Sequence, residues 1–502
     1  MKDQILYEKK IKKNTDFNVW MAFPGSRSFA LSALGYMFIC KQIDTMENIQ
    51  FEPIYLDTKK TEIMSKNVNL LGFSFSFDMD FISILTILEK HNFKLKSSQR
   101  DDEHALIFGG GPVLSSNPEP YFEIFDFIII GDGEDILKNV IDLCRNNKDL
   151  PRIERLKLLS ELEGVYVPSI GQNEVKKLTC KNLNVITTPL LSQDSFFPNT
   201  FIIEVERGCS NRCGFCIASY INLPIRFLDY DEIIKNIDFG LQYTNKIALL
   251  GAMIAKHPRF DDICNYIYEK VQNGQKIELS FSSLRADNIT DTVVKTLVAC
   301  GQKHSTIAIE AASERLRKII NKNLTENQIF NCVKICKDNG LKGLKIYAIL
   351  GLPNETQEDV EEFIVLAKKL KSSFKGFNFS FAFSTFVPKP HTPFQWCKRE
   401  DIKTLKEKQN YLKKEFHKLG IKVAFSSAKW DYYQSILSVG SRELSDAIFE
   451  IYKNGNSSSA FKKALSKFEN QYLLDETLPW DFIKMCVPKE FLKSEYKKLL
   501  KL

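Results

Sequence analysis

A loop with three closely spaced cysteines constrains this chain more than any other feature. Cys209, Cys213 and Cys216 follow an apolar run at 201–205 with the spacing C-x3-C-x2-C. Three thiolates on one short loop can each bind one iron of a 4Fe-4S cluster, which is normally held by four ligands. Zinc is the alternative, but it prefers four ligands, usually in paired C-x2-C units, and no nearby Cys or His completes such a set. The spacing therefore predicts a 4Fe-4S cluster with one iron open to a ligand from outside the protein.

The residue before the last cysteine adds a family resemblance. With Phe215 before Cys216, the loop resembles the C-x3-C-x-aromatic-C signature of the radical S-adenosylmethionine (radical SAM) superfamily. The resemblance implies that the amino and carboxylate groups of SAM chelate the open iron, and that an electron from the cluster cleaves SAM to a 5′-deoxyadenosyl radical. In such enzymes the cofactor supplies the chemistry, while the protein supplies position and excludes water. An electron donor such as flavodoxin or ferredoxin is then expected as a partner.

Upstream of this loop, residues 18–145 alternate between short apolar runs and helical patterns. Strands are expected at 19–23, 52–56, 69–75, 105–108 and 125–130, with helices near 29–43, 80–92 and 134–146. This alternation favours an α/β fold with a doubly wound, Rossmann-like parallel sheet, which we assign to residues 1–146. Ligands of such sheets bind outside the carboxyl ends of the strands.

Two of these strand ends are rich in glycine. The candidate ligand-binding residues are Gly110 and Gly111 after one strand and Gly131 and Gly133 after another, although ordinary turn chemistry also explains glycines there. The combination GGGPVLSSNPEP…FDFIIIGDGED resembles the cobalamin-binding-type domain found ahead of many radical SAM cores. The D-x-H-x-x-G motif, whose histidine ligates cobalt in that family, does not occur here. Either cobalamin binds without a protein histidine, or the domain keeps the fold without the cofactor.

From residue 201 the alternation resumes in six units. Strands are expected at 201–205, 247–250, 277–281, 306–310, 344–350 and 378–386, with helices near 230–240, 259–273, 290–300, 312–338, 355–371 and 400–419. Six units match the partial (βα)6 TIM-type barrel of the radical SAM family, which we place at residues 199–425. Reactive residues of such barrels lie where strands end.

Polar residues at these strand ends resemble the elements with which the family holds SAM. Ser283 and Arg285 could hold the ribose hydroxyls and the carboxylate, because arginine forks onto carboxylates. Glu310 could accept from the SAM amino group or ribose, or cap the helix that follows. Gly351 begins a G-x-P-x-E-T element whose backbone meets adenine in the family. Together with Phe215, these residues form the predicted SAM shell.

For the other polar and cysteine candidates, a purely structural role explains the residue at least as well as a functional one. Arg315 and Arg317 could meet the charge of the ligand, and His391, in the proline-rich loop 386–396, could handle a proton or hydrogen-bond within its loop. Cys332 and Cys336 lie four residues apart in a helical pattern, yet cysteine is often a small buried hydrophobe.

The remaining segments carry no predicted chemistry. Residues 147–198 are expected to form a connector hairpin, with short strands at 164–169 and 175–188 around a turn at 171–173. Residues 426–502 lose the βα pattern and are expected to form a helical C-terminal extension, either packing on the core or covering the barrel mouth.

The charge pattern and the cysteine content limit the classes of partner and the cellular location that we expect. The 69 basic and 62 acidic residues are mixed along the chain without a long basic block, which favours a solvated surface over a nucleic-acid interface and leaves the latter open. The N-terminus lacks the apolar core of a secretory signal, and no apolar stretch is long enough to span a membrane. Twelve cysteines without export signals indicate a reducing, cytoplasmic location.

These features favour a radical SAM enzyme acting on an unknown substrate, by methyl transfer if cobalamin binds and by another radical modification if it does not. A methylthiotransferase of tRNA or ribosomal protein is an alternative suggested by the proline loop. Such enzymes carry a second cysteine triad, whereas the N-terminal region offers only the scattered Cys40, Cys144 and Cys180. An alternative of another class is a non-catalytic corrinoid or iron–sulfur carrier or sensor.

Overall fold

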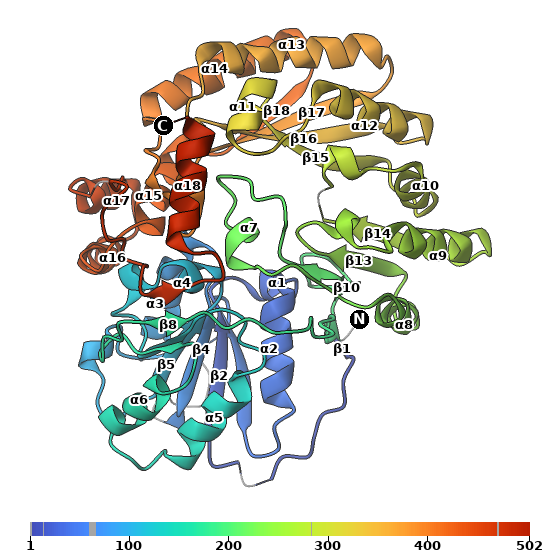
Figure 1. The fold of residues 1–502 in the computed structure, drawn as a ribbon. Coiled ribbons are helices and arrows are strands. Elements are labelled where there is room, and N and C mark those ends of the chain that lie inside the picture. Colours follow the sequence, from blue (N-terminus) through green and yellow to red (C-terminus); the bar gives the residue numbers. More distant parts are fainter. Residues whose placement is uncertain (1–2, 14, 60–66, 283, 469–470, 502) are drawn as a thin grey trace.

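The computed structural model describes residues 3–13, 15–59, 67–282, 284–468 and 471–501. Figure 1 shows an N-terminal sheet in blue at the bottom, an arc of strands and outer helices at the right and top, and C-terminal helices in red at the left. The cysteine loop and α7 (Ala218–Ile221) lie between the two α/β parts.

The N-terminal sheet has six strands in the order β3-β2-β4-β5-β6-β7. They are β2 (Asn18–Phe23), β3 (Gln50–Tyr55), β4 (Leu70–Ser74), β5 (Leu106–Gly110), β6 (Phe127–Ile129) and β7 (Val165–Tyr166). β2 to β6 pair in parallel, and β7 adds an antiparallel edge. The strand order reverses between β2 and β4, which is where doubly wound sheets bind ligands. The predicted doubly wound sheet is confirmed.

Helices cover both faces of this sheet. One face packs against α2 (Leu34–Asp44), α5 (Leu137–Asn146) and α6 (Arg152–Ser160). The other packs against α3 (Phe81–Lys90), α4 (Pro112–Ser116), α15 (Ala428–Ser438), α16 (Leu444–Lys453) and α17 (Ser458–Leu465). The C-terminal helices predicted for 426–502 therefore share a hydrophobic core with the N-terminal sheet; the rings of Phe81 and Phe461, for example, lie 6.1 Å apart. Their apolar faces are buried only because the sheet presents a matching apolar face.

The hairpin predicted for residues 147–198 is wrong. β7 pairs with β6, β8 (Val175–Lys176) pairs with β19 (Ile483–Lys484), and β9 (Leu190–Leu191) pairs with β1 (Gln4–Ile5). The segment also contains α6, so the N-terminal sheet and its helices extend past the predicted boundary at 146. Val165, Tyr166 and Val175 are buried in the cores of the N-terminal domain, and this burial outweighs a local pairing across the turn.

The second α/β part is an open barrel of parallel strands. Its first sheet contains β10 (Thr200–Glu204), β13 (Lys246–Leu250) and β14 (Glu278–Phe281), and its second contains β15 (His304–Glu310), β16 (Gly343–Leu350), β17 (Asn378–Thr385) and β18 (Lys422–Phe425). A parallel bridge between Leu284 and Ile307 joins the two sheets. The six predicted βα units are confirmed, and β18 is a further parallel strand that the sequence pattern did not indicate.

Helices surround this barrel on the outside (Figure 1). They are α8 (Tyr230–Leu241), α9 (Phe260–Gln272), α10 (Asp291–Ala299), α11 (Glu314–Ile319), α12 (Glu326–Asp338), α13 (Gln357–Ser373) and α14 (Ile402–Lys418). Along each strand, side chains alternate between the core beneath these helices and the barrel lumen. The last helix, α18 (Lys489–Leu500), contacts α11 and the 3-10 turn Pro393–Trp396.

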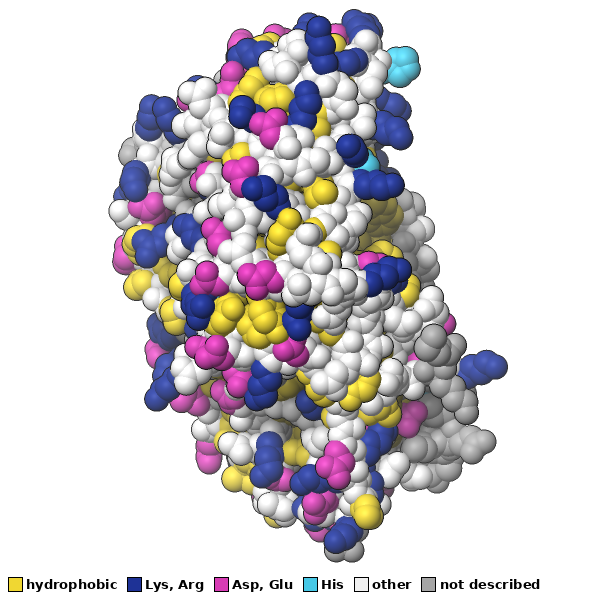
Figure 2. All heavy atoms as spheres, turned by 90° about the vertical axis from the view of Figure 1, so that its right-hand side faces the viewer, with side chains coloured by type: hydrophobic (Ala, Val, Ile, Leu, Met, Phe, Trp, Pro, Cys, Tyr) yellow, Lys and Arg dark blue, Asp and Glu magenta, His cyan; other side chains and the backbone are white. Residues whose placement is uncertain are grey.

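Charges of both signs are interspersed on the surface. On the face shown in Figure 2, Lys and Arg side chains alternate with Asp and Glu, as the mixed sequence pattern predicted. Within the described part of the chain, no helix is both long and apolar enough to cross a membrane.

Candidate active site

The three cysteines lie on the loop that follows β10. β10 ends at Glu204, a short strand β11 (Glu206–Arg207) follows, and the loop leads into α7. Burial raises the pKa of Cys213 to about 12, and the neighbouring Cys216 thiol adds to this rise. Burial also raises the pKa of Cys216, and the neighbouring Cys209 thiol adds to this rise. The three thiols therefore lie within electrostatic reach of one another at the carboxyl end of the first barrel strand.

The arrangement of these thiols fits a cluster better than a single metal ion. Within the described residues, no three Cys, His, Asp or Glu side chains converge closely enough to hold one ion. A structural zinc site requires such convergence. In an iron–sulfur cluster each thiolate binds a different iron, so the sulfurs lie further apart.

Neighbouring segments fix the backbone of the cysteine loop. The Arg212 carbonyl accepts hydrogen bonds from the Tyr220 hydroxyl and the Asn321 amide, each at 2.9 Å. The Gly214 N–H donates to the Ile320 carbonyl at 2.9 Å, and the Gly214 carbonyl accepts from the Phe394 N–H at 3.0 Å. A Cβ on Gly214 would lie 2.8 Å from the Phe394 ring, so the loop can pass there only as glycine. The α11 turn and the proline-rich loop thus hold the cysteines in place.

A buried group of two cations and a carboxylate lies beside Cys213. Lys322 Nζ contacts Glu310 Oε1 at 3.0 Å, and the Arg285 guanidinium donates to the Lys322 carbonyl and to Asp287. Both Lys322 and Arg285 act electrostatically on the Cys213 thiol and oppose the rise of its pKa. Burial alone would lower the pKa of Lys322, but the charge of Glu310 raises it above its usual value, so the amine stays protonated.

The backbone of Glu310 has an uncommon conformation for a residue with a side chain. Its φ is +64°, and the pairing of β15 with β16 shifts register between Ala308 and Glu310. Left-handed residues and bulges cluster at functional sites, where they re-aim a side chain. The bulge thus directs the Glu310 carboxylate toward Lys322 at the strand end.

Three other members of the predicted SAM shell have different environments. Phe215 packs beside the apolar cluster that contains Phe394. Gly351 follows the carboxyl end of β16 with φ +72°, and its N–H donates to Glu355 Oε1 at 2.9 Å. Ser283 lies outside the described residues.

The weaker candidates have structural roles. Arg315 forms an ion pair with Asp359, and Arg317 donates to three backbone carbonyls around its own turn. His391 Nε2 lies 3.0 Å from the Ser116 carbonyl, and burial lowers the pKa of His391 to about 3. A neutral, hydrogen-bonded histidine links the proline-rich loop to the N-terminal domain, whereas the structural interpretation placed its hydrogen bond within the loop.

The four predicted glycines line one cavity of about 380 Å³ at the carboxyl end of the N-terminal sheet. Gly111 and Gly131 have positive φ, and a Cβ on either would collide with a neighbouring backbone. Gly110 and Gly133 leave open space instead, because the nearest atom to a Cβ at these two positions would be 3.9 and 3.6 Å away. Two glycines therefore shape the turns, and two leave room for a ligand.

One wall of this cavity is an ion network that joins the two α/β parts. Arg207, two residues before Cys209, contacts Asp132 at 3.0 Å, Glu134 at 2.6 Å and Glu204 at 2.8 Å. Asp132 also contacts Arg226 at 2.6 Å. The acidic residues of the G-D-G-E motif thus bind arginines of the barrel part, and the cavity adjoins the segment that leads into the cysteine loop.

Comparison with known families identifies both parts. A model described as the radical SAM superfamily matches residues 203–367, which contain the cysteine loop, Arg285, Glu310 and Gly351. A second model, described as the N-terminal part of radical SAM proteins, matches residues 36–168. The chain belongs to the radical SAM superfamily. It is a radical SAM enzyme whose cofactors include a 4Fe-4S cluster and SAM, so the carrier or sensor alternative is set aside.

Relatives of this radical SAM enzyme differ in how much of it they match. Protein MJ0966 of Methanocaldococcus jannaschii is 29% identical over 89% of this chain and 94% of its own length. A protein of Pyrococcus horikoshii described as an uncharacterized methyltransferase, PH0819, is 27% identical over 56% of this chain and 62% of its own length. The tRNA-2-methylthio-N(6)-dimethylallyladenosine synthase of Acetivibrio thermocellus is 24% identical over 43% of this chain and 47% of its own length. This methylthiotransferase is thus more distant and matches less than half of its own length.

Among solved structures, TsrM of Kitasatospora setae resembles this enzyme in fold. TsrM is described as a radical SAM methyltransferase with cobalamin and a [4Fe-4S] cluster bound. The TM-score is 0.52 at 15% identity, covering 74% of this chain and 75% of TsrM.

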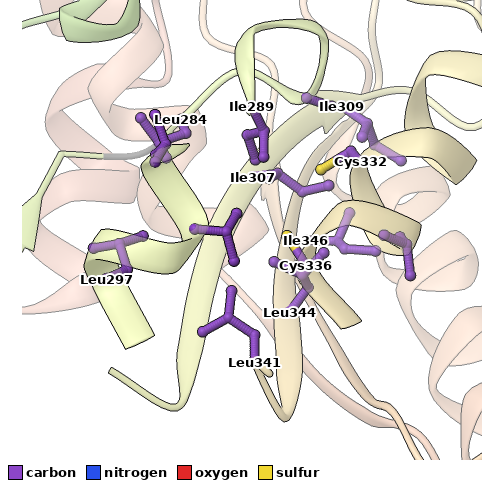
Figure 3. Packing of buried hydrophobic residues seen from close by; sticks show 14 of the residues in the cluster. Leu284, Ile289, Leu297, Ile307, Ile309, Cys332, Cys336, Leu341, Leu344 and Ile346 are labelled. Atoms are coloured by element: carbon purple, nitrogen blue, oxygen red, sulfur yellow. The ribbon is translucent and has the colours of Figure 1, made fainter. Parts of the chain in front are cut away.

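Eight of the nine cysteines outside the loop are buried, and Cys486 is exposed. Figure 3 shows Cys332 and Cys336 among aliphatic side chains of the barrel, and both are fully buried. Cys40 and Cys144 lie on α2 and α5 beneath the N-terminal sheet. Cys40, Cys144 and Cys180 lie on three separate segments, the first two on different helices.

Two functional candidates were missed from the sequence. Lys322 lies in the stretch after Glu310, and only the folded turn brings it back to that carboxylate. Arg207 lies in the charged pair before the cysteine loop, a position that could have been noted, but its acidic partners in the N-terminal domain are not adjacent in sequence.

Proposed function

We propose that this radical SAM enzyme binds cobalamin in the N-terminal cavity and transfers a methyl group to a carbon atom of its substrate. The observation that carries the proposal is the position of the cavity. It lies at the switch point of the N-terminal sheet and adjoins Arg207, which leads into the cysteine loop. The likeness to TsrM and to the Pyrococcus methyltransferase supports the same chemistry.

In the barrel, Cys209, Cys213 and Cys216 would ligate the cluster. Glu310 and the cations Lys322 and Arg285 would bind the oppositely charged groups of SAM, since they lie beside Cys213. The buried setting of this group excludes water and strengthens these interactions. When bound, the cluster supplies the electron that initiates SAM cleavage, and a donor such as flavodoxin or ferredoxin would re-reduce it.

The cavity residues fit a corrinoid in two respects. Apolar side chains such as Phe73, Phe108 and Ile39 form much of the wall, and the open backbone at Gly110 and Gly133 offers hydrogen-bonding groups to amide substituents. Cobalamin exceeds 380 Å³, so only part of it would be enclosed. None of the described lining residues is a histidine, so the cobalt would not receive an imidazole from this wall.

The first experiment tests the cluster and SAM. The enzyme is reconstituted anaerobically with iron and sulfide, reduced, and supplied with SAM. Formation of 5′-deoxyadenosine is expected from wild type and lost in Cys213→Ala, while Cys264→Ala, which changes a buried core cysteine, keeps it. A Cys213→Ala protein that still cleaves SAM would contradict the assignment.

The second experiment tests the corrinoid. Gly110→Leu places a side chain in the cavity without a collision at Cβ, so it should block cobalamin while iron content and SAM cleavage to 5′-deoxyadenosine persist. Cobalamin retained after gel filtration is measured by its visible spectrum. Wild-type protein that binds no corrinoid, or forms no S-adenosylhomocysteine with cobalamin and substrate present, would rule out cobalamin-dependent methyl transfer.

A further inference from the structure

Tyr347 presents an exposed aromatic ring among small side chains on the lumen wall of the barrel. Ile346 and Phe381 face the outer helices and are buried, so the alternate residues face the lumen. Register pairs Tyr347 with Ala308 on one side and Ala382 on the other. Tyr347 is 40% exposed, and the alanines beside it in register do not cover the ring.

A cavity begins beside this ring. It has a volume of about 420 Å³ and lies where β14 meets β15. Its lining includes Tyr347 and several polar side chains, namely Ser280, Ser282, Gln302, His304 and Thr306. A flat apolar surface with a few polar groups around it is a usual setting for a planar polar ligand.

Two lysines lie in the next row toward the amino ends of the strands. Register aligns Lys345, Ser380 and Lys422 on three adjacent strands. Lys345 Nζ lies 4.8 Å from the centroid of the Tyr347 ring and so covers it. Neither lysine forms an ion pair with a carboxylate in the described part of the chain, and both stand in register with Ser380. The lumen thus holds two cations that no acidic neighbour neutralises.

The ring lies close to the level of the candidate SAM site. Because of the bulge, Glu310 pairs with Ala348, the residue after Tyr347, which corresponds to roughly 3 Å along β16. A ligand stacked on Tyr347 would therefore reach Glu310 and Lys322 toward the carboxyl ends of the strands. Toward the amino ends it would reach Lys345 and Lys422.

We propose that this lumen site binds a nucleotide, with its base stacked on Tyr347 and its phosphate between Lys345 and Lys422. The role of this nucleotide as the methylated substrate rests on the proposed function. A dianionic phosphate suits two lysines flanking a serine hydroxyl, because its charge matches theirs and lysine commonly binds phosphate as a point charge. Base stacking on an aromatic side chain accepts any base, and the polar lining of the cavity can meet base edges. On binding, the base replaces Lys345 over the ring and frees this amine for the phosphate.

The nucleotide can be free or part of an RNA strand, and binding distinguishes the two. Cluster-loaded enzyme is titrated calorimetrically with AMP, GMP, CMP and UMP and with a short single-stranded oligoribonucleotide. Tighter binding of the oligonucleotide indicates RNA, and equal or weaker binding indicates a free nucleotide.

Tyr347→Ala should weaken binding roughly 5- to 150-fold, the range expected when one base loses its aromatic stacking partner. Lys345→Met and Lys422→Met should each weaken binding, and with the oligonucleotide each should reduce the salt slope by about 0.7 for every phosphate that is no longer neutralised. Tyr243→Ala is the matched control, because Tyr243 is also 40% exposed but lies outside the lumen after α8. Lys334→Ala on the outer helix α12 controls for the removal of one charge.

Absence of binding to every probe, or equal binding by Tyr347→Ala and wild type, would overturn the nucleotide site. These outcomes are separate from those of the proposed function, because binding is measured without methyl transfer. An enzyme that binds nucleotides through Tyr347 but never forms S-adenosylhomocysteine would rule out methyl transfer and keep the site.

Discussion

The ion network between the two α/β parts gives the sharpest stability prediction. Asp132 bridges Arg207 and Arg226, and its side chain is 9% exposed, while that of Arg226 is 5% exposed. Among the described residues Asp132 is the only carboxylate paired with Arg226, whose other contacts are backbone carbonyls. Asp132→Asn therefore leaves a buried guanidinium without a counter-ion.

Breaking such a buried pair from one side costs about 3–5 kcal/mol. With an unfolding entropy of about 2 cal/mol/K per residue, this corresponds to a fall in Tm of about 3–5 °C for a chain of 502 residues. The assay is thermal unfolding of the cluster-free protein followed by circular dichroism. Glu163→Gln, which removes an exposed partner of Lys176, is the matched control and should leave Tm unchanged.

A double-mutant cycle and the pH dependence complete the test. Arg226→Met combined with Asp132→Asn removes both charges, so the destabilisation should be smaller than the sum for the two single variants. Burial would raise the pKa of Asp132, but Arg207 and Arg226 outweigh it and hold the pKa below its usual value. The stabilisation is therefore complete above about pH 4 and is lost as pH falls through the folded pKa, so wild type and Asp132→Asn should converge in acid. Additive destabilisation, or a single variant as stable as wild type, would refute the reasoning.

Three further predictions concern the cluster, SAM and the core. Gly214→Ala places a methyl group 2.8 Å from a buried phenyl ring, so iron loading after reconstitution should fall severalfold; normal loading would show that the loop tolerates the shift. Lys322→Met removes the cation that lies 3.0 Å from Glu310, so the affinity for SAM, measured by equilibrium dialysis, should fall about tenfold. An unchanged affinity would show that the Lys322 amine does not bind SAM. Cys332→Ala should cost about 1–2 kcal/mol in urea unfolding with iron content unchanged, and a fall in iron content would refute its role as a core residue.

Local patterns predicted the parts of this enzyme that depend on neighbours in the chain. Cys209, Cys213 and Cys216 are close in sequence, and strand ends are marked by the change from apolar runs to polar residues, which is why Arg285 and Glu310 could be singled out. The same patterns could not separate catalytic from structural arginines. Arg317 has a structural role because its guanidinium donates hydrogen bonds to three backbone carbonyls around its own turn, and this arrangement exists only in the folded chain.

The sequence by itself determined the cofactor loop, the doubly wound sheet and the six βα units, because spacing and periodicity are local properties. Only the tertiary structure decided where segments distant in sequence meet. In the tertiary structure Asp132 pairs with Arg226, and the C-terminal helices pack on the N-terminal sheet. The two strands of the expected hairpin pair with β6 and β19 instead of with each other, and Tyr347 is exposed between alanines. The physical reason is that burial rewards whichever apolar faces fit together, and this choice depends on the whole chain at once.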